Sequence, residues 1–186
     1  MSFEIEQKFH VEDVSELERR LAELGAIETG TQRHSDSYYN HPSRDFRETR
    51  EALRIRRVDG VPMITYKGPK LPGSVKARKE CEWRLDPGDR DGSATEELLQ
   101  ILGFQSVAVV TKSRRCFELP GELHEFDVVI DEVPFLGRFA EVELVVEGPN
   151  QVEEARRRIA EISADLGLRQ AEPRSYITML QELSTS

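Results

Sequence analysis

Two carboxylates and an ammonium alternate along the first extended segment of the chain, at Glu4, Glu6 and Lys8. Neighbouring side chains of a β-strand point to opposite faces, so these charges share one face and the apolar residues between them share the other. Carboxylate oxygens bind divalent metal ions, and an ammonium binds phosphate oxygens. This face could hold a metal ion and a polyphosphate together, although a strand face in water shows the same pattern.

The same alternation recurs in later segments that read as strands. In Leu53-Arg54-Ile55-Arg56, the two arginines share a face and the aliphatic residues share the other. Across the predicted strands, one face collects the cations Lys8, Arg54, Arg56, Lys67, Arg78, Lys112 and Arg114. It also collects the carboxylates Glu4, Glu6, Glu80, Glu82, Asp127, Asp131, Glu141 and Glu143.

Amphipathic strands in water explain each segment alone, but they do not explain how the charges are grouped. Arg and Lys concentrate on the middle strands, whereas carboxylates fill the first strand and the later ones. We therefore favour a sheet that curls so that its charged face lines a water-filled lumen. Like charges crowded in such a lumen need counter-ions, which a polyphosphate and a divalent metal ion would supply.

The elements that must position these side chains are mostly strands. Period-2 patterns predict strands over 3–9, 26–39, 52–58, 61–67, 78–85, 104–119, 123–133 and 138–147. Helices are predicted over 13–24, 93–102, 151–166 and 173–183, and 44–51 reads as a loop or a short helix. Asp59-Gly60 predicts a hairpin turn, and hairpin-type connections imply antiparallel pairing. The predicted fold class is α+β, with helices packed outside an antiparallel sheet.

The bulk composition narrows the classes of protein to which this chain could belong. The chain has 186 residues, enough for a single domain over 1–186, and 38% of them are hydrophobic. A net charge of −9 disfavours nucleic-acid binding, and the sequence has no apolar run long enough to span a membrane. With only Cys81 and Cys116 and no signal peptide, the sequence favours a cytoplasmic protein with reduced thiols.

Three further features have two interpretations each. Trp83 and Phe126 are expected in the core rather than as platforms for base stacking. The arginines at 156–158 are typical of a solvated helix face or a dimer rim, so a homodimer stays open. The loop over 68–77, with its lysines, is either a gate that attracts an anion or an ordinary solvated loop.

The opening Glu4-Ile5-Glu6-Gln7-Lys8 resembles the ExExK signature of the CYTH, or triphosphate tunnel metalloenzyme, family. Supporting motifs follow in order across nearly the whole chain. They are Leu53-Arg54-Ile55-Arg56, Tyr66-Lys67-Gly68-Pro69, Lys112-Ser113-Arg114, Phe139-Ala140-Glu141-Val142-Glu143 and Glu172-Pro173-Arg174-Ser175-Tyr176. Each motif is weak alone, whereas the ordered set is fairly specific.

The resemblance implies a closed antiparallel barrel of about eight strands around a polar tunnel. It implies a small-molecule triphosphate as ligand and Mg²⁺ or Mn²⁺ as cofactor. The implied triphosphate-binding residues are Lys8, Arg54, Arg56, Lys67, Arg78, Lys112, Arg114 and Arg174. The implied metal ligands are Glu4, Glu6, Glu141 and Glu143. Glu80, Glu82 and Asp131 are candidates for catalytic duty on the metal or on a proton, and the sequence does not rank them.

Within this family, the stretch His34-Ser35-Asp36-Ser37-Tyr38-Tyr39 and the motif that begins at Glu172 resemble the class IV adenylyl cyclase branch. The first functional hypothesis is therefore a lyase that converts ATP to cyclic AMP and pyrophosphate. The second is a hydrolase that uses water in the same tunnel, on inorganic triphosphate, thiamine triphosphate or a nucleoside triphosphate. The third is a non-catalytic module that binds polyphosphate or a nucleotide.

Overall fold

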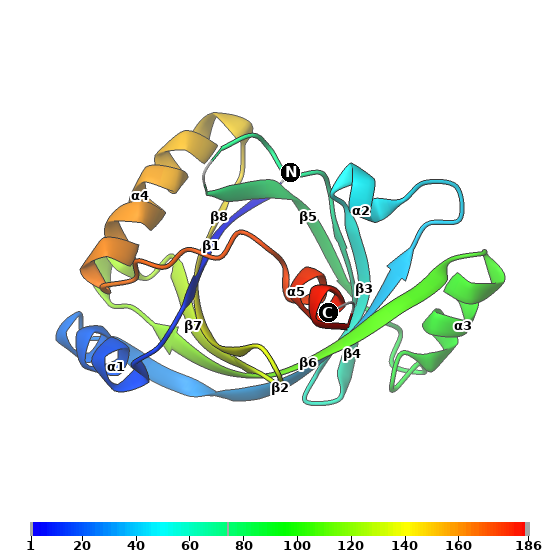
Figure 1. The fold of residues 1–186 in the computed structure, drawn as a ribbon, viewed down its shortest axis with the longest axis horizontal. Helices are drawn as coiled ribbons and strands as arrows, with labels where there is room; N and C mark the ends of the chain where they lie inside the picture. The colour runs from blue at the N-terminus through cyan, green and yellow to red at the C-terminus, as the bar shows by residue number, and fades with distance from the viewer. Residues whose placement is uncertain (1, 74, 185–186) are drawn as a thin grey trace.

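The structure is a computed structural model, and it describes residues 2–73 and 75–184. Eight strands close into a barrel in the order β1-β5-β4-β3-β2-β6-β7-β8. Every neighbouring pair is antiparallel, including the β1–β8 pair that closes the ring. Figure 1 shows this ring with α1, α3 and α4 outside it. The closed barrel expected from the family resemblance is confirmed.

The elements agree with the predicted ranges to within a few residues. The strands are β1 Phe3–His10, β2 Ile27–Asn40, β3 Ala52–Val58, β4 Val61–Lys67, β5 Lys76–Arg84, β6 Gln105–Glu118, β7 Phe126–Val133 and β8 Gly137–Val146. The α-helices are α1 Val14–Glu23, α2 Phe46–Thr49, α3 Ser93–Ile101, α4 Val152–Asp165 and α5 Tyr176–Ser184. One difference matters for the site: β5 begins at Lys76, so this lysine belongs to the barrel wall and pairs in register with Glu6.

The main apolar core lies outside the barrel, between its wall and two helices. Ile5 of β1 and Val142 of β8 are fully buried, and they belong to one cluster with Leu17 of α1 and Ile159 of α4. The Asp13 side chain begins α1 by accepting a hydrogen bond from the Glu16 backbone N–H at 3.1 Å. Because the apolar strand faces pack outward under α1 and α4, the opposite, charged faces point into the barrel.

A second apolar cluster covers the wall formed by β3. It contains Leu53 and Ile55 of β3, Phe46 of α2 and Leu99 of α3. The Asp59-Gly60 turn that follows β3 has positive φ at both residues, 49° and 87°, as the predicted tight hairpin requires. This turn sets the β3–β4 register and keeps Arg54 and Arg56 on the inner face.

The expectation for Trp83 was wrong. Its side chain is 58% exposed, whereas Phe126 is buried as expected. Trp83 lies near the end of β5. Alternation alone distinguishes the two faces of a strand, but it does not tell which part of an apolar face a helix will cover.

The α5 helix lies across one end of the barrel. In Figure 1 it appears within the ring of strands. Its Tyr176 and Met179 are buried in a cluster with Val110, Val133 and Phe139, from three strands. An apolar layer therefore closes part of this end. Within the described residues, no helix is long and apolar enough to cross a membrane.

Candidate functional site: a charged tunnel

The inner faces of the strands enclose a cavity of about 210 Å³. Its lining includes the predicted cations Lys8, Arg54, Arg56, Lys67, Arg78, Lys112 and Arg114. It also includes the predicted carboxylates Glu4, Glu6, Glu80, Glu82, Glu141 and Glu143. The structure therefore brings together nearly all of the charged side chains that the alternation placed on one face.

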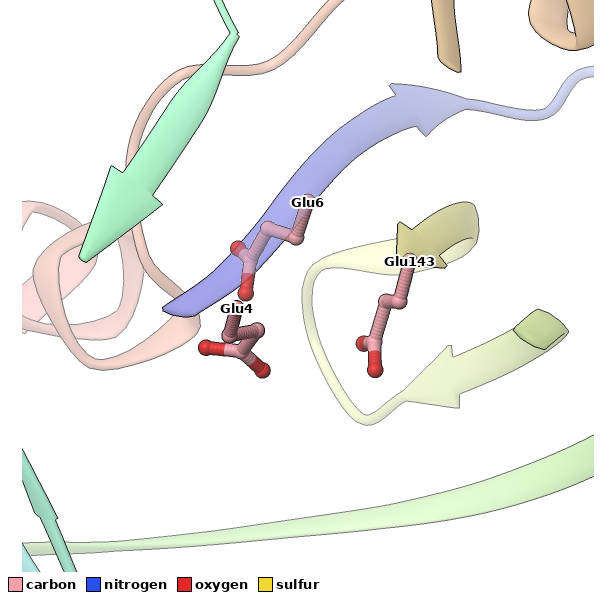
Figure 2. Close-up of side chains that lie close together, drawn as sticks. All are labelled: Glu4, Glu6 and Glu143. Atoms are coloured by element: carbon pink, nitrogen blue, oxygen red, sulfur yellow. The ribbon is translucent and has the colours of Figure 1, made fainter. Parts of the chain in front are cut away.

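Three carboxylates of this cavity form a compact cluster. Glu4 and Glu6 come from β1 and Glu143 from β8, and one ligand oxygen of each lies within 4.8 Å of the others. Figure 2 shows the three side chains close together beside the two strands. The cluster follows from the register, because Glu6 pairs directly with Glu143 across the β1–β8 ladder. Oxygen ligands at this spacing suit a hard divalent cation.

The protonation of this cluster fits the same interpretation. Burial raises the pKa of Glu4 to about 8, and the neighbouring Glu6 adds to the effect while Lys67 opposes it. Burial also raises the pKa of Glu143 to about 7, with Glu141 and Glu6 as further causes. The third carboxylate differs: burial alone would raise the pKa of Glu6, but Lys76 and Lys67 outweigh it and hold the pKa well below its usual range. Burial and crowding thus favour protons on Glu4 and Glu143, and a bound cation would replace those protons.

Glu141, which the resemblance implied as a metal ligand, lies beside a different set of groups. It forms an ion pair with Arg114 and lies 4.0 Å from the Lys112 ammonium. Burial alone would raise the pKa of Glu141, but Lys112 and Arg114 outweigh it and lower the pKa. In this structure Glu141 neutralises cations, and Glu143 completes the carboxylate cluster.

Asp131 is fully buried at the centre of a hydrogen-bonded network. Arg114 binds both of its carboxylate oxygens at 2.7 Å, and the Lys112 ammonium lies 2.7 Å away. The Tyr176 hydroxyl donates to the same carboxylate at 2.9 Å. Burial alone would raise the pKa of Asp131, but these two cations hold it well below its usual range. A carboxylate with these partners is suited to orienting the cations that it binds.

Arg174 lies apart from the cavity. Its guanidinium forms ion pairs with Glu172 and Glu182, and its side chain is about half exposed. Glu172 is buried and also contacts the His10 ring at 3.1 Å. The structure thus places Arg174 in a network that holds the segment leading into α5.

Asp36 and Tyr176 line the tunnel, but the motifs that contain them predicted no tunnel role for either residue. Asp36 of β2 is buried and binds Arg56 at 2.8 Å and Arg54 at 3.1 Å. Asp36 alternates with His34 and Tyr38, so period-2 spacing places all three on one strand face. The pattern is hard to recognise in the sequence, because β2 carries polar residues on both faces. Tyr176 carried no such signal, because it enters the tunnel from a helix.

Most cations of the tunnel are paired with its carboxylates. The Lys67 ammonium lies 2.6 Å from Glu4 and 2.7 Å from Glu80. Lys76 lies 2.8 Å from Glu6. The positive and negative groups therefore serve as counter-ions for one another, and an incoming polyanion has to exchange places with carboxylates.

A second cavity, of about 390 Å³, adjoins the tunnel at the end where α2 and α5 lie. Arg54, Lys67 and Arg78 line both cavities, so the two are adjacent. The second cavity adds aromatic and aliphatic surface from Phe46 and Ile177. Its further lining includes Arg47, Arg50, Lys70, Thr178 and Gln181.

A small cavity of about 200 Å³ adjoins the tunnel at Arg114 and Glu143, and its lining also includes Gln32 and His34. The His34 ring nitrogen Nε2 lies 2.9 Å from the Gln32 side chain. Burial lowers the pKa of His34 to about 3, helped by the positive charges of Arg56 and Lys112. The imidazole is therefore neutral at physiological pH and adds no charge to this end.

A closed antiparallel barrel, with cations and carboxylates lining its lumen and three of the carboxylates clustered, defines this protein as a charged-tunnel barrel. The chain belongs to the CYTH family, because the CYTH domain matches residues 2–176. The resemblance inferred from the motifs is thus confirmed over nearly the whole chain.

Two curated relatives bear adenylate cyclase names. A putative adenylate cyclase of Methanocaldococcus jannaschii is 32% identical over 165 residues, which cover 89% of this chain and 90% of the relative. An adenylate cyclase of Aeromonas hydrophila is 27% identical over 188 aligned positions, covering 98% of this chain and 91% of the relative.

Solved structures show the same fold. A protein from Pyrococcus horikoshii is 35% identical and superposes with a TM-score of 0.85, covering 97% of this chain and 99% of that one. A putative adenylyl cyclase from Hippeastrum, described as having a dominant triphosphatase activity, is 18% identical with a TM-score of 0.66. It covers 98% of this chain and 96% of its own, and the likeness concerns the fold.

Proposed function

We propose that this protein is an adenylyl cyclase of the class IV type, which converts ATP to cyclic AMP and pyrophosphate. The observation that carries the proposal is the pair of adjacent cavities, which share Arg54, Lys67 and Arg78. The tunnel offers cations for a triphosphate, and the adjoining cavity of about 390 Å³ offers aromatic surface and polar groups for a nucleoside. Inorganic triphosphate has no nucleoside, so nothing in it would fill the second cavity. The names of the curated relatives support the same activity.

In this proposal the cations of the tunnel bind the triphosphate oxygens and stabilise the charge on the leaving pyrophosphate. Arg54, Lys67 and Arg78 lie where the two cavities meet, so they suit the phosphate nearest the nucleoside. Lys8, Lys112 and Arg114 lie deeper and suit the two phosphates that leave. Arginine adds orientation, because its planar guanidinium binds two phosphate oxygens at once.

Glu4, Glu6 and Glu143 would hold the divalent cation, Mg²⁺ or Mn²⁺. When bound there, the cation would neutralise phosphate oxygens and lower the pKa of the ribose 3′-hydroxyl. The reaction joins the 3′-oxygen to the α-phosphorus and breaks the bond from that phosphorus to the pyrophosphate.

Within residues 2–73 and 75–184, Glu82 has no ammonium or guanidinium within 4.0 Å and contacts the Thr65 hydroxyl at 2.9 Å. Glu80 and Asp131, the other two candidate carboxylates, each form an ion pair with a lysine. Glu82 is therefore the best suited of the three to accept the proton of the 3′-hydroxyl.

The test is to incubate the purified protein with ATP and either Mg²⁺ or Mn²⁺ and to identify the products. Cyclic AMP and pyrophosphate in equal amounts are the expected result. Glu82→Gln should lower the rate while triphosphate binding persists. Binding of ATP without turnover in either metal would overturn the proposal and favour a non-catalytic module.

The alternative is a triphosphatase, and one observation favours it. A small cavity beside His34 shares Arg114 and Glu143 with the tunnel, so it would suit a water molecule that attacks a terminal phosphate. The description of the Hippeastrum protein shows that a CYTH-type barrel can carry such an activity. Release of orthophosphate from inorganic triphosphate, faster than formation of cyclic AMP from ATP, would establish this alternative.

A further inference from the structure

Lys8 differs from the other lysines of the barrel wall. Its side chain is 2% exposed, yet within the described part of the chain no carboxylate oxygen lies within 4.0 Å of its ammonium. Lys67, Lys76 and Lys112 each have a carboxylate within 2.8 Å. A buried ammonium without an anionic partner requires another source of stabilisation.

That source is an aromatic ring. The Lys8 ammonium lies 3.9 Å from the centroid of the Tyr176 ring and 5.8 Å from that of Phe139. The Lys112 ammonium lies 5.2 Å from the same Tyr176 centroid. The negative face of an aromatic ring attracts a cation at such distances, most strongly where water is excluded.

The Tyr176 ring is itself held firmly in place. Its hydroxyl donates to Asp131 at 2.9 Å, and its edge packs against Phe139 with the ring centroids 5.2 Å apart. Because Asp131 also binds Lys112 and Arg114, one residue of α5 contacts the network that orients the deep cations of the tunnel.

We propose that Tyr176 is a positioning residue of the triphosphate site, which holds Lys8 charged and directed into the tunnel without neutralising it. This inference rests on the proposed binding of a triphosphate in the tunnel. A carboxylate partner would occupy the ammonium and have to be displaced by the ligand. A ring stabilises the cation through its face and leaves N–H donors free for phosphate oxygens.

The experiment measures the dissociation constant of inorganic tripolyphosphate by calorimetry on the full chain in metal-free buffer. Tyr176→Phe keeps the ring and should bind within about threefold of the unmodified protein. Tyr176→Leu removes the ring and should weaken binding about tenfold to thirtyfold. Phenylalanine analogues with one, two and three ring fluorines at position 176 should weaken binding stepwise, because fluorine withdraws charge from the ring face.

Two controls separate this role from a structural one. Met179→Ala removes a buried side chain from the same helix and the same apolar cluster, and it should leave tripolyphosphate affinity within about threefold. In a Lys8→Ala background, Tyr176→Leu should cost clearly less affinity than it does with Lys8 present, because the main contact of the ring is already lost and only its contacts with Lys112 and Asp131 remain. The unfolding temperature of each variant checks that the barrel is intact.

Equal binding by phenylalanine and its fluorinated analogues would overturn the inference, as would a full additional loss in the Lys8→Ala background. The analogues have nearly the shape of phenylalanine, so they decide the question even if Tyr176→Leu fails to fold. The readout is binding rather than turnover. A protein that shows the ring dependence but makes no cyclic AMP would therefore refute the proposed reaction and leave this inference standing.

Discussion

At the scale of single residues, the tunnel is a set of charges that neutralise one another. Lys67 contacts Glu4 and Glu80, and Asp36 holds two arginines. The carboxylate cluster is only partly neutralised: Glu4 and Glu143 have raised pKa values although Lys67 and Arg114 lie nearby, because three carboxylates are crowded together. A cation bound there would complete the neutralisation.

We expect Glu6→Gln to abolish metal-dependent turnover while the barrel stays folded. The amide keeps the size of the side chain but removes a negative charge from the cluster with Glu4 and Glu143. Turnover of ATP with Mg²⁺ or Mn²⁺ and the far-ultraviolet circular dichroism spectrum are the two measurements. Glu132→Gln, on an exposed outward position of β7, is the control and should behave like the unmodified protein. Unchanged turnover in the Glu6 variant would remove this residue from the site.

Lys112→Ala should weaken the binding of triphosphate more than that of monophosphate. The ammonium lies deep in the tunnel, where only the longer ligand reaches it together with the cations near the second cavity. Loss of one charged hydrogen bond predicts a decrease in triphosphate affinity of about tenfold to a hundredfold. Competition binding with inorganic phosphate and tripolyphosphate makes the comparison. Equal losses for both ligands would argue against binding along the tunnel.

Much of this site was predictable because a strand converts spacing in the sequence into a shared face. Alternation placed Glu4, Glu6, Arg54 and Arg114 inward, and the structure agrees. What alternation could not predict is which charges contact one another, because partners come from strands far apart in sequence. The separation of Glu141 from the Glu143 cluster is one such result, and it depends on the closed barrel.

At the scale of elements, the hairpins were the most predictable part of the fold. Local turn chemistry fixed the β3–β4 connection at Asp59-Gly60, and β3 and β4 have the predicted bounds. The placement of α5 was not predictable in this way. Its apolar residues indicate burial but not the surface on which they are buried, and that surface is the end of the barrel.

The packing of β2 against its neighbours predicts a loss of stability in acid. His34 of β2 faces Arg56 of β3 and both Lys112 and Arg114 of β6, and the charge of Asp36 opposes theirs. The unfolded chain protonates this histidine below a pH of about 6.5. The folded protein resists protonation until a pH of about 3, because burial and the cations lower the pKa. The free energy of unfolding should therefore fall as the pH drops between these values.

The contribution of His34 is at most one proton, or about 1.4 kcal/mol per pH unit. Urea unfolding at a series of pH values between 7 and 4 measures the slope. His34→Gln should show a shallower slope than the unmodified protein, because it removes the titrating group. Parallel slopes for the two proteins would contradict the predicted burial of a neutral imidazole.

At the scale of the whole molecule, the exchange of counter-ions predicts that metal and triphosphate bind cooperatively. A cation at the carboxylate cluster would release Lys67 and Lys76 from Glu4 and Glu6, and the freed ammonium groups would bind phosphate. Thermodynamic reciprocity then requires each ligand to increase the affinity for the other. The rise in unfolding temperature with Mg²⁺ and tripolyphosphate together should exceed the sum of the separate rises.

Because Mg²⁺ also binds tripolyphosphate in solution, the comparison needs a variant. Glu143→Gln weakens the cluster without touching either lysine, so it should bring the combined effect close to the sum. If the variant keeps the full combined effect, the coupling arises in the ligands and not in the protein.

The ring of strands closes where β1 meets β8, two segments more than a hundred residues apart in sequence. Glu6 and Glu143 lie opposite each other on this junction. A divalent ion there would cross-link the beginning and the end of the barrel, at the pairing with the greatest entropic cost of loop closure. The same ion that serves the chemistry would then slow the opening of the fold, and chelators should accelerate unfolding even when no nucleotide is present.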